Sequence, residues 1–324
     1  MLSGRGILFI AASMSALLIS GCAQSASPVV GPAASVPAAS VPAAPGYVCA
    51  SGNIFTQPIG VPVRQTVTLG DTTATLTGTS ASDGVEPSAL DGGSLTITTA
   101  GHPPVTVPMT APTGSSIVDL FTIQTQAEQA SALVEDVDTD GSLCLVRFSA
   151  GATPVALVGL TSGGVHCCTV VRAAPVDGSA VVDHTFDNYQ PWLRSTADGV
   201  VLVSADNAFA AQFSSFAGSG PPVQLFSWTG SAFIDVTQRH LDLVLEDAQR
   251  YRAAYDHPAG PEKLGYLAGW VADECVAGAT AAAWTFVDQQ AELGLLTDEN
   301  NFSSGTYEDQ LRQFVTAHGY CPAG

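Results

Sequence analysis

Residues 143–171 read LCLVRFSAGATPVALVGLTSGGVHCCTVV, three apolar runs separated by small and turn-forming residues. The runs Leu143–Phe148, Val155–Leu160 and Val165–Val171 are rich in aliphatic and β-branched side chains, and each has the length of a β-strand. Ser162-Gly163-Gly164 is a turn signal between the last two runs. The stretch therefore predicts consecutive strands, and it is the centre from which we read the fold.

The same pattern extends in both directions, from Tyr47 to about Thr237. Turn markers such as Asp91-Gly92-Gly93 and Asp198-Gly199 separate short β-branched runs at the spacing of an antiparallel sheet. We therefore expect residues 47–237 to form an antiparallel β-rich domain, a propeller-like or sandwich-like meander. The further runs are Gln65–Leu69, Thr73–Thr77, Ser94–Thr98, Pro104–Met109, Val200–Ser204 and Val223–Trp228.

After Thr237 the pattern becomes helical. Thr237 is a candidate N-cap of a helix that runs to about Asp256. Thr306 and Asp309 form a capping pattern for the last helix. Residues 238–324 are therefore expected to form a small C-terminal helical domain, which makes the fold class α+β. Further apolar stripes at helical spacing occupy residues 264–275, 279–293 and 307–318.

The N-terminus has the layout of an export signal, with Arg5 ahead of an apolar stretch that ends near Ile19. Residues 17–22 read LLISGC, which resembles the lipobox of bacterial lipoproteins. That resemblance implies a signal peptide over residues 1–21, cleavage after Gly21, and a diacylglyceryl thioether on Cys22. An ordinary secretory signal and an uncleaved anchor are the alternatives, although the apolar run is short for a membrane span.

Residues 22–46 consist almost entirely of alanine, proline, serine and valine after the cysteine, with the near-repeats 34–38 and 39–43. Such a segment cannot build a core, and its prolines favour an extended conformation. We expect a tether that holds the folded part away from the membrane. The lipid on Cys22 would then place the protein on the extracytoplasmic face of the cell membrane.

The chain is strongly acidic, with a formal charge of −19 and charged residues at only 12%. Lys263 is its only lysine, and it contains no basic cluster. Nucleic-acid binding needs cations that neutralise phosphates, and adsorption to anionic lipid needs basic clusters. Neither is expected here, so membrane attachment would depend on the lipid of Cys22.

Seven cysteines are present, and an even set remains once Cys22 is assigned to lipid. In an oxidising compartment such a set predicts disulfides. We expect Cys275 to pair with Cys321, because both lie where two predicted helices would pack together. For the others, either Cys167 and Cys168 each pair with one of Cys49 and Cys144, or each couple pairs within itself. The six are Cys49, Cys144, Cys167, Cys168, Cys275 and Cys321.

Three patches resemble a family of exported bacterial proteins related to the FG-GAP/VCBS repeat group. They are the acidic loop 136–141, the segment SGGVHCCT at 162–169 with its Gly-Gly-x-His-Cys-Cys signature, and segments between Asp206 and Thr237. The helical segment Leu267–Asp273 also fits. The resemblance covers roughly residues 130–320 and implies a propeller-like, β-rich fold in an extracellular setting. It implies no defined activity, because a fold does not determine function.

The loop Asp136-Val137-Asp138-Thr139-Asp140-Gly141 is a candidate Ca²⁺ site, because alternating carboxylates on a tight turn can direct oxygens at one cation. It is not an EF-hand, since the twelfth position is Arg147. Where the related family has an acidic residue at the ninth position, this chain has Cys144. The alternative is a solvated turn whose Asp136, Asp138 and Asp140 side chains bond to local amides.

No catalytic set stands out. A thiol nucleophile at Cys167 is disfavoured in an oxidising compartment, and the acidic pairs Glu246-Asp247 and Glu308-Asp309 are expected on solvated helix faces. The function expected is non-catalytic binding or scaffolding, with a cell-envelope protein or glycan as partner. The alternative is an extracytoplasmic hydrolase acting on cell-wall carbohydrate. Its carboxyl pair would lie in a cleft, and the acids to examine are Asp183, Asp187, Asp198 and Asp206.

Overall fold

The computed structural model describes residues 46–51, 58–82, 89–113, 115–116, 118–125, 141–162, 168–258, 262–296 and 306–322. The chain divides into two units, Met1–Val41 and Pro42–Gly324, and every described residue belongs to the second. The signal peptide, the tether up to residue 45 and the lipidation of Cys22 lie outside the described residues and stay predictions.

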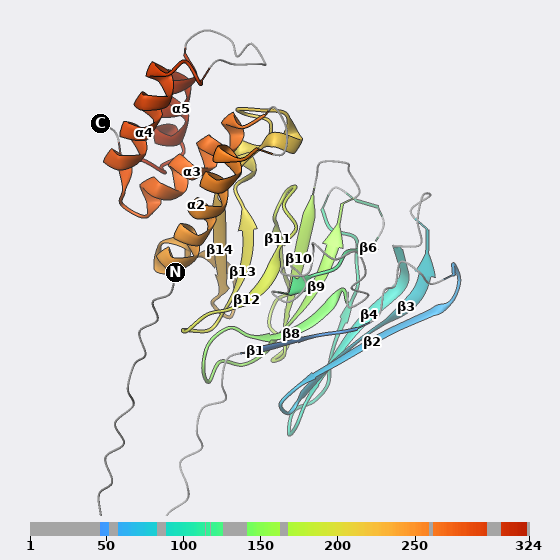
Figure 1. Cartoon of the computed structure of the whole chain (residues 1–324). Helices are drawn as coiled ribbons and strands as arrows, with labels where there is room; N and C mark the ends of the chain where they lie inside the picture. The colour runs from blue at the N-terminus through green and yellow to red at the C-terminus, as the bar shows by residue number, and fades with distance from the viewer. Residues whose placement is uncertain are drawn as a thin grey trace, which may run out of the picture. The chain divides into compact units, whose positions relative to one another are not determined.

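The larger sheet is antiparallel throughout the described residues and runs in the order β1-β8-β9-β6-β4-β3-β2 (Figure 1). β10 and β11 extend it from the other edge of β9, and β5 pairs with β4. The ends of the order, β1 and β2, contact each other, so the sheet is nearly closed and barrel-like. Its strands are β1 (Gly46–Cys49), β2 (Pro62–Leu69), β3 (Thr72–Ala81), β4 (Ala89–Thr99), β5 (Val105–Pro108), β6 (Asp119–Leu120), β8 (Leu143–Arg147), β9 (Val155–Thr161), β10 (Thr169–Pro175) and β11 (Val182–Thr185).

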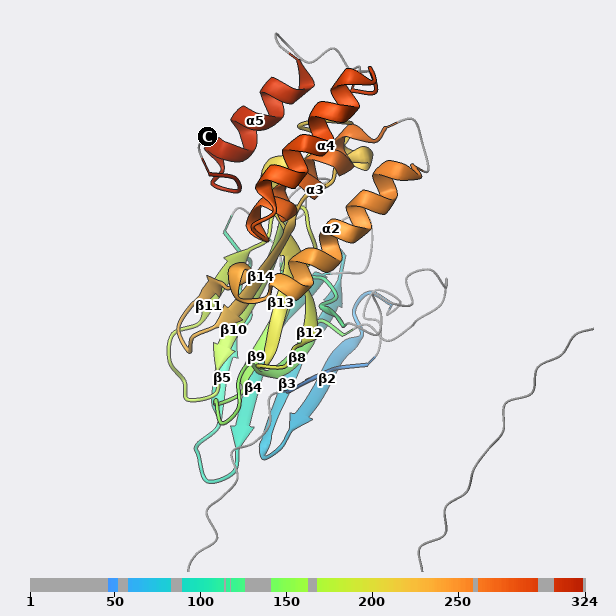
Figure 2. The ribbon, with the colours of Figure 1, turned by 60° about the vertical axis from the view of Figure 1, so that its left-hand side comes forward.

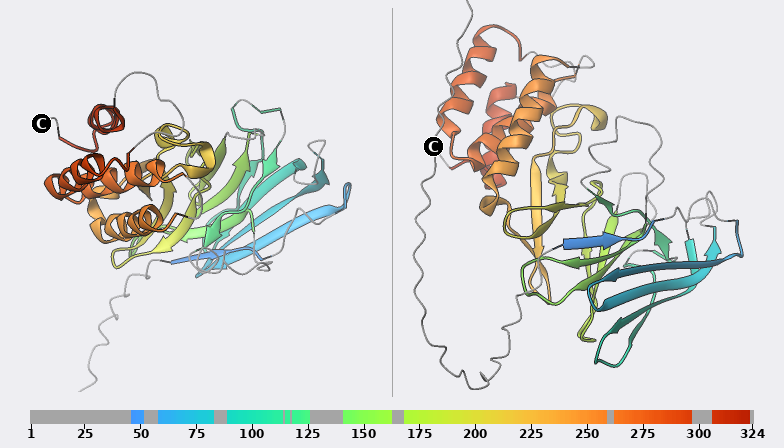
Figure 3. Two further views of the ribbon diagram at one scale, coloured as in Figure 1. Left: turned by 45° about the horizontal axis from the view of Figure 1, so that its top comes forward. Right: turned by 60° about the horizontal axis from the view of Figure 1, so that its bottom comes forward.

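The smaller sheet, called sheet B below, runs in the order β15-β14-β13-β12-β7. Its pairs are antiparallel except β12 with β7, which are parallel. Figure 3 shows the long strands β2, β3 and β4 of the larger sheet side by side, apart from the strands of sheet B. The strands of sheet B are β7 (Gln124–Thr125), β12 (Trp192–Ser195), β13 (Val200–Ala205), β14 (Val223–Trp228) and β15 (Phe233–Asp235).

The central strand β8 is buried on both faces, which explains why its sequence is apolar almost without interruption. Successive side chains of a strand point to opposite faces. Leu143 and Leu145 accordingly join the core enclosed with β2, β3 and β4. Cys144 and Val146 join a second core, which the larger sheet forms with sheet B. The same alternation continues in β9 and β10, whereas β2 buries only every second residue.

Two predicted boundaries are wrong. The strand formed by the third run of the quoted stretch extends to Pro175, beyond the predicted end at Val171. Thr237 is not the N-cap of the first long helix, because its hydroxyl accepts a hydrogen bond from the backbone N–H of Leu225 at 2.9 Å. Thr237 instead begins a short 3-10 helix, η4 (Thr237–Arg239), and His240 is the N-cap residue of the α-helix that follows.

Four α-helices follow the strands in the described part of the chain, so the fold class is α+β as predicted. Figure 2 shows the beginning of α2 over the ends of β13 and β14. The contacts agree, since Leu243 and Val244 of α2 pack against Val201 and Leu225 of sheet B. The boundary at residues 237/238 is thus a change of secondary structure across a shared core. The helices are α2 (Leu241–Asp256), α3 (Leu264–Val276), α4 (Thr280–Glu292) and α5 (Tyr307–Ala317).

The helical core is completed by aromatic side chains from the strand region. Phe209, in the 3-10 helix η2 (Asn207–Phe209), and Phe213 are both buried among residues of α3 and α5. Phe314 of α5 meets both rings edge-on, at centroid distances of 4.9 and 5.2 Å. These contacts anchor the helices to the segment between β13 and β14.

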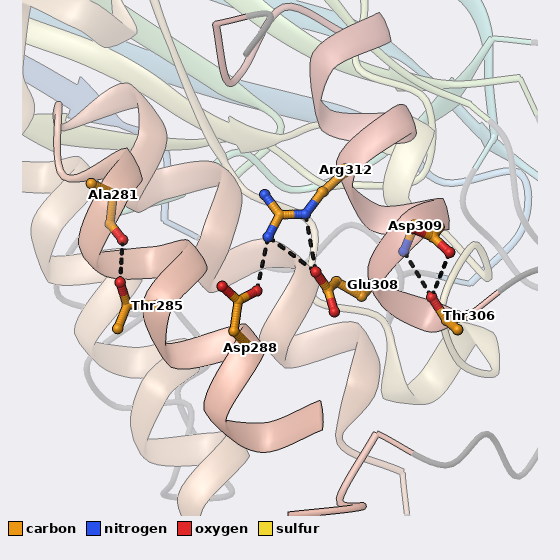
Figure 4. Close-up of polar contacts among 7 residues, drawn as sticks. All are labelled: Ala281, Thr285, Asp288, Thr306, Glu308, Asp309 and Arg312. Atoms are coloured by element: carbon orange, nitrogen blue, oxygen red, sulfur yellow. Dashed lines mark hydrogen bonds and ion pairs between the residues drawn. The ribbon is translucent and has the colours of Figure 1, made fainter. Parts of the chain in front are cut away.

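The last helix begins as its sequence predicts. The Thr306 hydroxyl accepts a hydrogen bond from the Asp309 N–H at 3.2 Å and donates one to the Asp309 carboxylate (Figure 4). Arg312 bonds to Glu308 on the same helix and to Asp288 of α4, which ties the two helices together (Figure 4). Gly319 then ends the segment with a φ of 78°, a left-handed conformation that suits glycine.

Candidate binding groove

A groove of about 610 Å³ lies between α2 and sheet B. Its walls are the turn before β12, the strands β12 to β14, the segment before β14, and α2. A volume of this size is typical of sites for small molecules. Its lining residues are Asn188, Tyr189, Gln190, Trp192, Arg194, Val203, Ser204, Ala205, Pro221, Val223, Leu225, Leu243, Glu246, Asp247 and Arg250.

The periodicities of helix and strand bring these residues to one place. Leu243, Asp247 and Arg250 lie one and two turns apart on α2 and therefore share a face. Trp192 and Arg194 are two residues apart on β12 and point to the same side of the sheet. All five line the groove, and Leu243 and Trp192 also pack against the small apolar core beneath it.

An ion pair joins the two walls. Both terminal nitrogens of Arg194 on β12 donate to the carboxylate of Glu246 on α2, at 3.1 and 2.6 Å. The Arg194 guanidinium also lies 5.8 Å from the ring centroid of Trp192. The side chain of Glu246 is 60% exposed, so this pair sits at the mouth of the groove and contributes little to stability by itself.

Asp247 does not behave as its neighbour does, and the prediction that Glu246-Asp247 is a solvated pair is wrong for it. Its side chain is only 11% exposed, because α2 turns it toward the sheet. One carboxylate oxygen accepts from Arg250 Nε at 2.9 Å, and the other accepts from the backbone N–H of Val223 at 3.1 Å. Asp247 thereby fixes the start of β14 to α2.

Behind Asp247 lies a second carboxyl group, that of Asp273 on α3, which is 1% exposed. Burial raises the pKa of Asp273 well above its usual range, and the hydrogen-bonded carboxylate of Asp247 raises it further. One oxygen of Asp273 has no hydrogen-bond partner. The two carboxyl groups thus share a buried contact between α2 and α3, and this contact favours the protonated form of Asp273.

The turn before β12 is held by hydrogen bonds but leaves two polar atoms without partners. Tyr189 O accepts from Ser204 Oγ at 2.9 Å, and Gln190 donates to the backbone oxygen of Thr122. Asn188 donates to Asn207 at 2.6 Å, while its own side-chain oxygen is buried without a partner. The Tyr189 hydroxyl is also buried without a hydrogen-bond partner. Burial and the charge of Asp206 raise the pKa of Tyr189.

A second hollow of about 640 Å³ lies on the other side of β14, lined among others by Asp206, Asp235, His318 and Tyr320. Asp206 is occupied there, since it accepts from the Tyr320 hydroxyl at 2.7 Å and from the Ala208 N–H at 2.9 Å. These bonds tie η2 to the end of α5, so we interpret this hollow as structural.

The acids proposed for a hydrolase do not gather in the groove, and none of these four residues lines it. Asp183 accepts two hydrogen bonds from the buried Arg172, each at 2.7 Å, in the larger sheet. Asp206 is engaged as described above. Asp187 lies in a left-handed conformation with a φ of 50°, and Asp198 is exposed in the turn before β13.

Two disulfides join pairs of described cysteines. Cys49 of β1 faces Cys144 of β8 in register and is bonded to it, and Cys275 of α3 is bonded to Cys321 beyond α5. Cys168 is also disulfide-bonded. Because β9 separates β8 from β10, a bond from Cys144 to the 167–168 segment would have to cross two strand spacings, about 10 Å.

The predicted calcium site does not belong to the part of the chain that the structure describes. Asp136, Asp138 and Asp140 lie outside the described residues, as do Cys167 and Cys22. Over the part of the chain that the structure describes, no three histidine, cysteine or acidic side chains are arranged to hold a metal ion. Over the same part, no helix is long and apolar enough to cross a membrane.

No sequence motif marks the main groove residues as candidates for a binding site. Trp192, Tyr189 and Asp247 belong to three segments that carry no shared motif, and they meet only because β12 and α2 pack against the same strands. Asp273 can be noticed in the sequence by its surroundings. It is the single acid in the segment LAGWVAD, whose other residues are apolar or glycine, and an isolated acid in a buried helix indicates a specific partner.

Comparison with known proteins gives two relatives. The chain is 28% identical over 194 residues to a probable thylakoid lumen protein of Synechocystis sp., which covers 52% of this chain and 57% of that protein. It is 26% identical over 179 residues to an uncharacterized protein of Sinorhizobium fredii, which covers 48% of this chain and 28% of that protein. The chain thus spans little more than half of one relative and under a third of the other.

No protein-family model matches the chain, and no solved structure gives a significant match. The likeness to the FG-GAP/VCBS repeat group therefore stays a prediction from three motifs.

Proposed function

We propose that this protein is a lipid-anchored binding protein of the extracytoplasmic membrane face, and that its ligand occupies the groove between α2 and sheet B. Cleavage after Gly21 and lipidation of Cys22 would anchor it, and residues 22–46 would act as the tether. Two acyl chains on one residue suffice for stable attachment, whereas a single chain is marginal.

Two observations support the location. The described residues contain two disulfides, and such bonds persist in oxidising compartments. A relative at 28% identity is a probable lumen protein, and we take that compartment as a guide to an extracytoplasmic setting here. The lipid itself is proposed from the lipobox alone.

The groove carries the binding proposal. It combines an apolar floor with aromatic and hydrogen-bonding side chains on its walls, and two polar atoms of the wall lack partners. Both oxygens of Asp247 are already engaged, by Arg250 and by Val223, and Asp273 is not among the lining residues. A site whose carboxylates hold the scaffold together is suited to binding rather than to proton transfer.

A matched pair of substitutions tests this proposal. Glu246 lines the groove and Leu245, its neighbour, does not, yet both side chains are exposed. A soluble extract of the cell envelope should raise the melting temperature of the wild type and of Leu245→Trp, because bound ligand stabilises the folded state. Glu246→Trp should abolish the rise. An equal rise in both variants would refute the groove as the site.

The anchor is tested separately. The mature protein should begin at Cys22, with the mass of a diacylglyceryl group on that residue, and Cys22→Ala should release it from the membrane fraction. A soluble wild-type protein would refute lipid anchoring without affecting the groove.

A hydrolase acting on cell-wall carbohydrate is the second candidate, and one observation favours it. Asp247, which lines the groove, lies beside the buried carboxyl group of Asp273, whose pKa is raised well above its usual range, and a carboxylic acid of raised pKa is what a general acid needs. In that case purified protein should release soluble sugars from cell-wall polymer, and Asp247→Asn should stop the release. Absence of any release by the wild type would exclude this alternative.

A further inference from the structure

We infer that the groove binds an uncharged oligosaccharide, a ligand class that rests on the proposed function of the groove as a binding site. Three features of its lining point to this chemistry: its charge balance, its aromatic side chains, and its amide and hydroxyl groups.

The charges of the groove cancel. Its two cations are Arg194 and Arg250, and its two anions are Glu246 and Asp247. Each arginine is bonded to one of the acids, at 2.6 Å for Arg194–Glu246 and through Arg250 Nε at 2.9 Å to Asp247. An ionic ligand would have to break one of these pairs, and an anionic ligand would also approach a chain of formal charge −19. The lining thus favours a neutral ligand.

The aromatic side chains offer flat apolar surface next to hydrogen-bonding groups. Trp192 lines the groove and is only partly buried, and Tyr189 lines it beside Asn188 and Gln190. Tyr189 is held in place by a stack on Phe216, with ring centroids 6.4 Å apart and planes 8° apart. The C–H face of a pyranose ring packs on such surfaces while its hydroxyls bond to the polar groups around them, since tryptophan and tyrosine are both apolar and polar.

The polar side chains of the wall suit a ligand that both donates and accepts. Asn188, Gln190 and Ser204 line the groove with amide and hydroxyl groups. A sugar hydroxyl both donates and accepts, so it can bond to such groups directly or through an ordered water.

The size of the groove limits the ligand. A volume of about 610 Å³ is within the range for small-molecule sites and suits a short oligosaccharide. The Arg194–Glu246 pair connects the walls at its mouth, and its guanidinium and carboxylate can each bond to neighbouring hydroxyls without either charge being removed.

Calorimetric titration of the full-length protein in detergent tests this inference. The probes are neutral oligosaccharides of two to five residues built from glucose, mannose or N-acetylglucosamine, an acidic oligogalacturonate, and an uncharged pentapeptide. A neutral oligosaccharide should bind, with an affinity that changes less than about twofold between low and high salt, because little net charge is exchanged. Trp192→Ala should weaken it about tenfold or more, a loss of about 1.4 kcal/mol.

The controls separate folding from binding. Trp284→Ala removes a tryptophan of α4 that packs in the helical core and leaves the groove intact, so affinity should stay within about twofold. Asn188→Ala, a smaller change in the wall, should weaken the sugar even if Trp192→Ala unfolds.

Each remaining outcome is informative. Binding of the peptide or of oligogalacturonate alone would overturn the sugar class and leave the groove as a binding site. Failure of every probe, while Glu246→Trp still removes stabilisation by envelope extract, would likewise overturn the sugar class only. If the extract acts equally on Leu245→Trp and Glu246→Trp, the proposed function itself fails. If neither Trp192→Ala nor Asn188→Ala changes the affinity for the sugar, the sugar binds elsewhere and the inference is overturned.

Discussion

Asp273 of α3 is hydrogen-bonded to Asp247 of α2, and burial together with this neighbouring acid raises the pKa of Asp273 well above its usual range. Asp247 in turn holds Arg250 and the start of β14. These contacts link two helices to the edge of the groove.

The pair makes stability depend on pH. The folded-state pKa of Asp273 is raised, so this group's stabilising contribution is complete below the unfolded pKa of about 3.9 and is lost as pH rises toward the folded value. Asp273→Asn keeps a donor toward Asp247 and removes the titration. Urea unfolding from pH 4 to 8 should show the wild type losing stability relative to this variant, by at most about 1.4 kcal/mol per pH unit.

Asp198→Asn removes a carboxylate from an exposed turn and serves as the control for lost charge. Its unfolding stability should change with pH as that of the wild type does. Parallel curves for wild type and Asp273→Asn would show that Asp273 titrates alike in the folded and unfolded states.

Gly269 allows α3 to approach the segment before β14. A Cβ at this position would lie 2.1 Å from the backbone oxygen of Gly220, which a side-chain rotation cannot relieve. Gly269→Ala should therefore destabilise the protein by about 1–3 kcal/mol, as overpacking does. Chemical denaturation measures this, with Gly46→Ala as the control, because a Cβ there meets nothing within 4 Å. Equal stability of the two variants would contradict the close approach.

The bond between Cys275 and Cys321 closes the helical part of the chain across 46 residues. Its removal in Cys275→Ser/Cys321→Ser should cost about 2–4 kcal/mol, since the unfolded chain regains freedom. Thermal unfolding under non-reducing conditions provides the measurement, and reductant should lower the wild type toward the variant. A variant as stable as the wild type would mean that packing alone holds α3 and α5.

Cys168 must bond to a cysteine outside the described residues, and Cys22 is predicted to carry lipid. We therefore predict a bond between the neighbours Cys167 and Cys168. Non-reducing peptide mapping should find both in one peptide, lighter by two hydrogen atoms than its reduced form and linked to no other peptide. A crosslink from this peptide to the N-terminal peptide would contradict both this bond and the lipidation of Cys22.

The acidic loop at 136–141 can be tested without reference to its structure. If Asp136, Asp138 and Asp140 bind Ca²⁺, millimolar calcium should raise the melting temperature of the wild type. Asp138→Ala should remove the rise, and magnesium should not replace calcium, because it requires a tighter octahedral site. No shift in the wild type would end the calcium hypothesis.

Some elements could be predicted because their signals are local. Thr306 and Asp309 cap α5 as expected from their spacing, and Gly319 ends it, because capping depends on atoms within one turn. The short strands β11 and β12 were not predicted. Their sequences VDHT and WLRS contain charged residues and are too brief for a periodic signal, and neighbouring strands impose their conformation.

By itself the sequence determined the class of the fold and its central strands, because a run such as LCLVR has no polar face and must be buried on both sides. Its periodicities also located the four helices of the described residues. Only the tertiary structure decided that Cys49 pairs with Cys144, because strand register, not chain order, sets which cysteines face each other. It alone brought Trp192, Asn188 and Asp247 to one groove and turned Asp247 inward beside Asp273. Those contacts join residues far apart in the chain, and no local pattern encodes them.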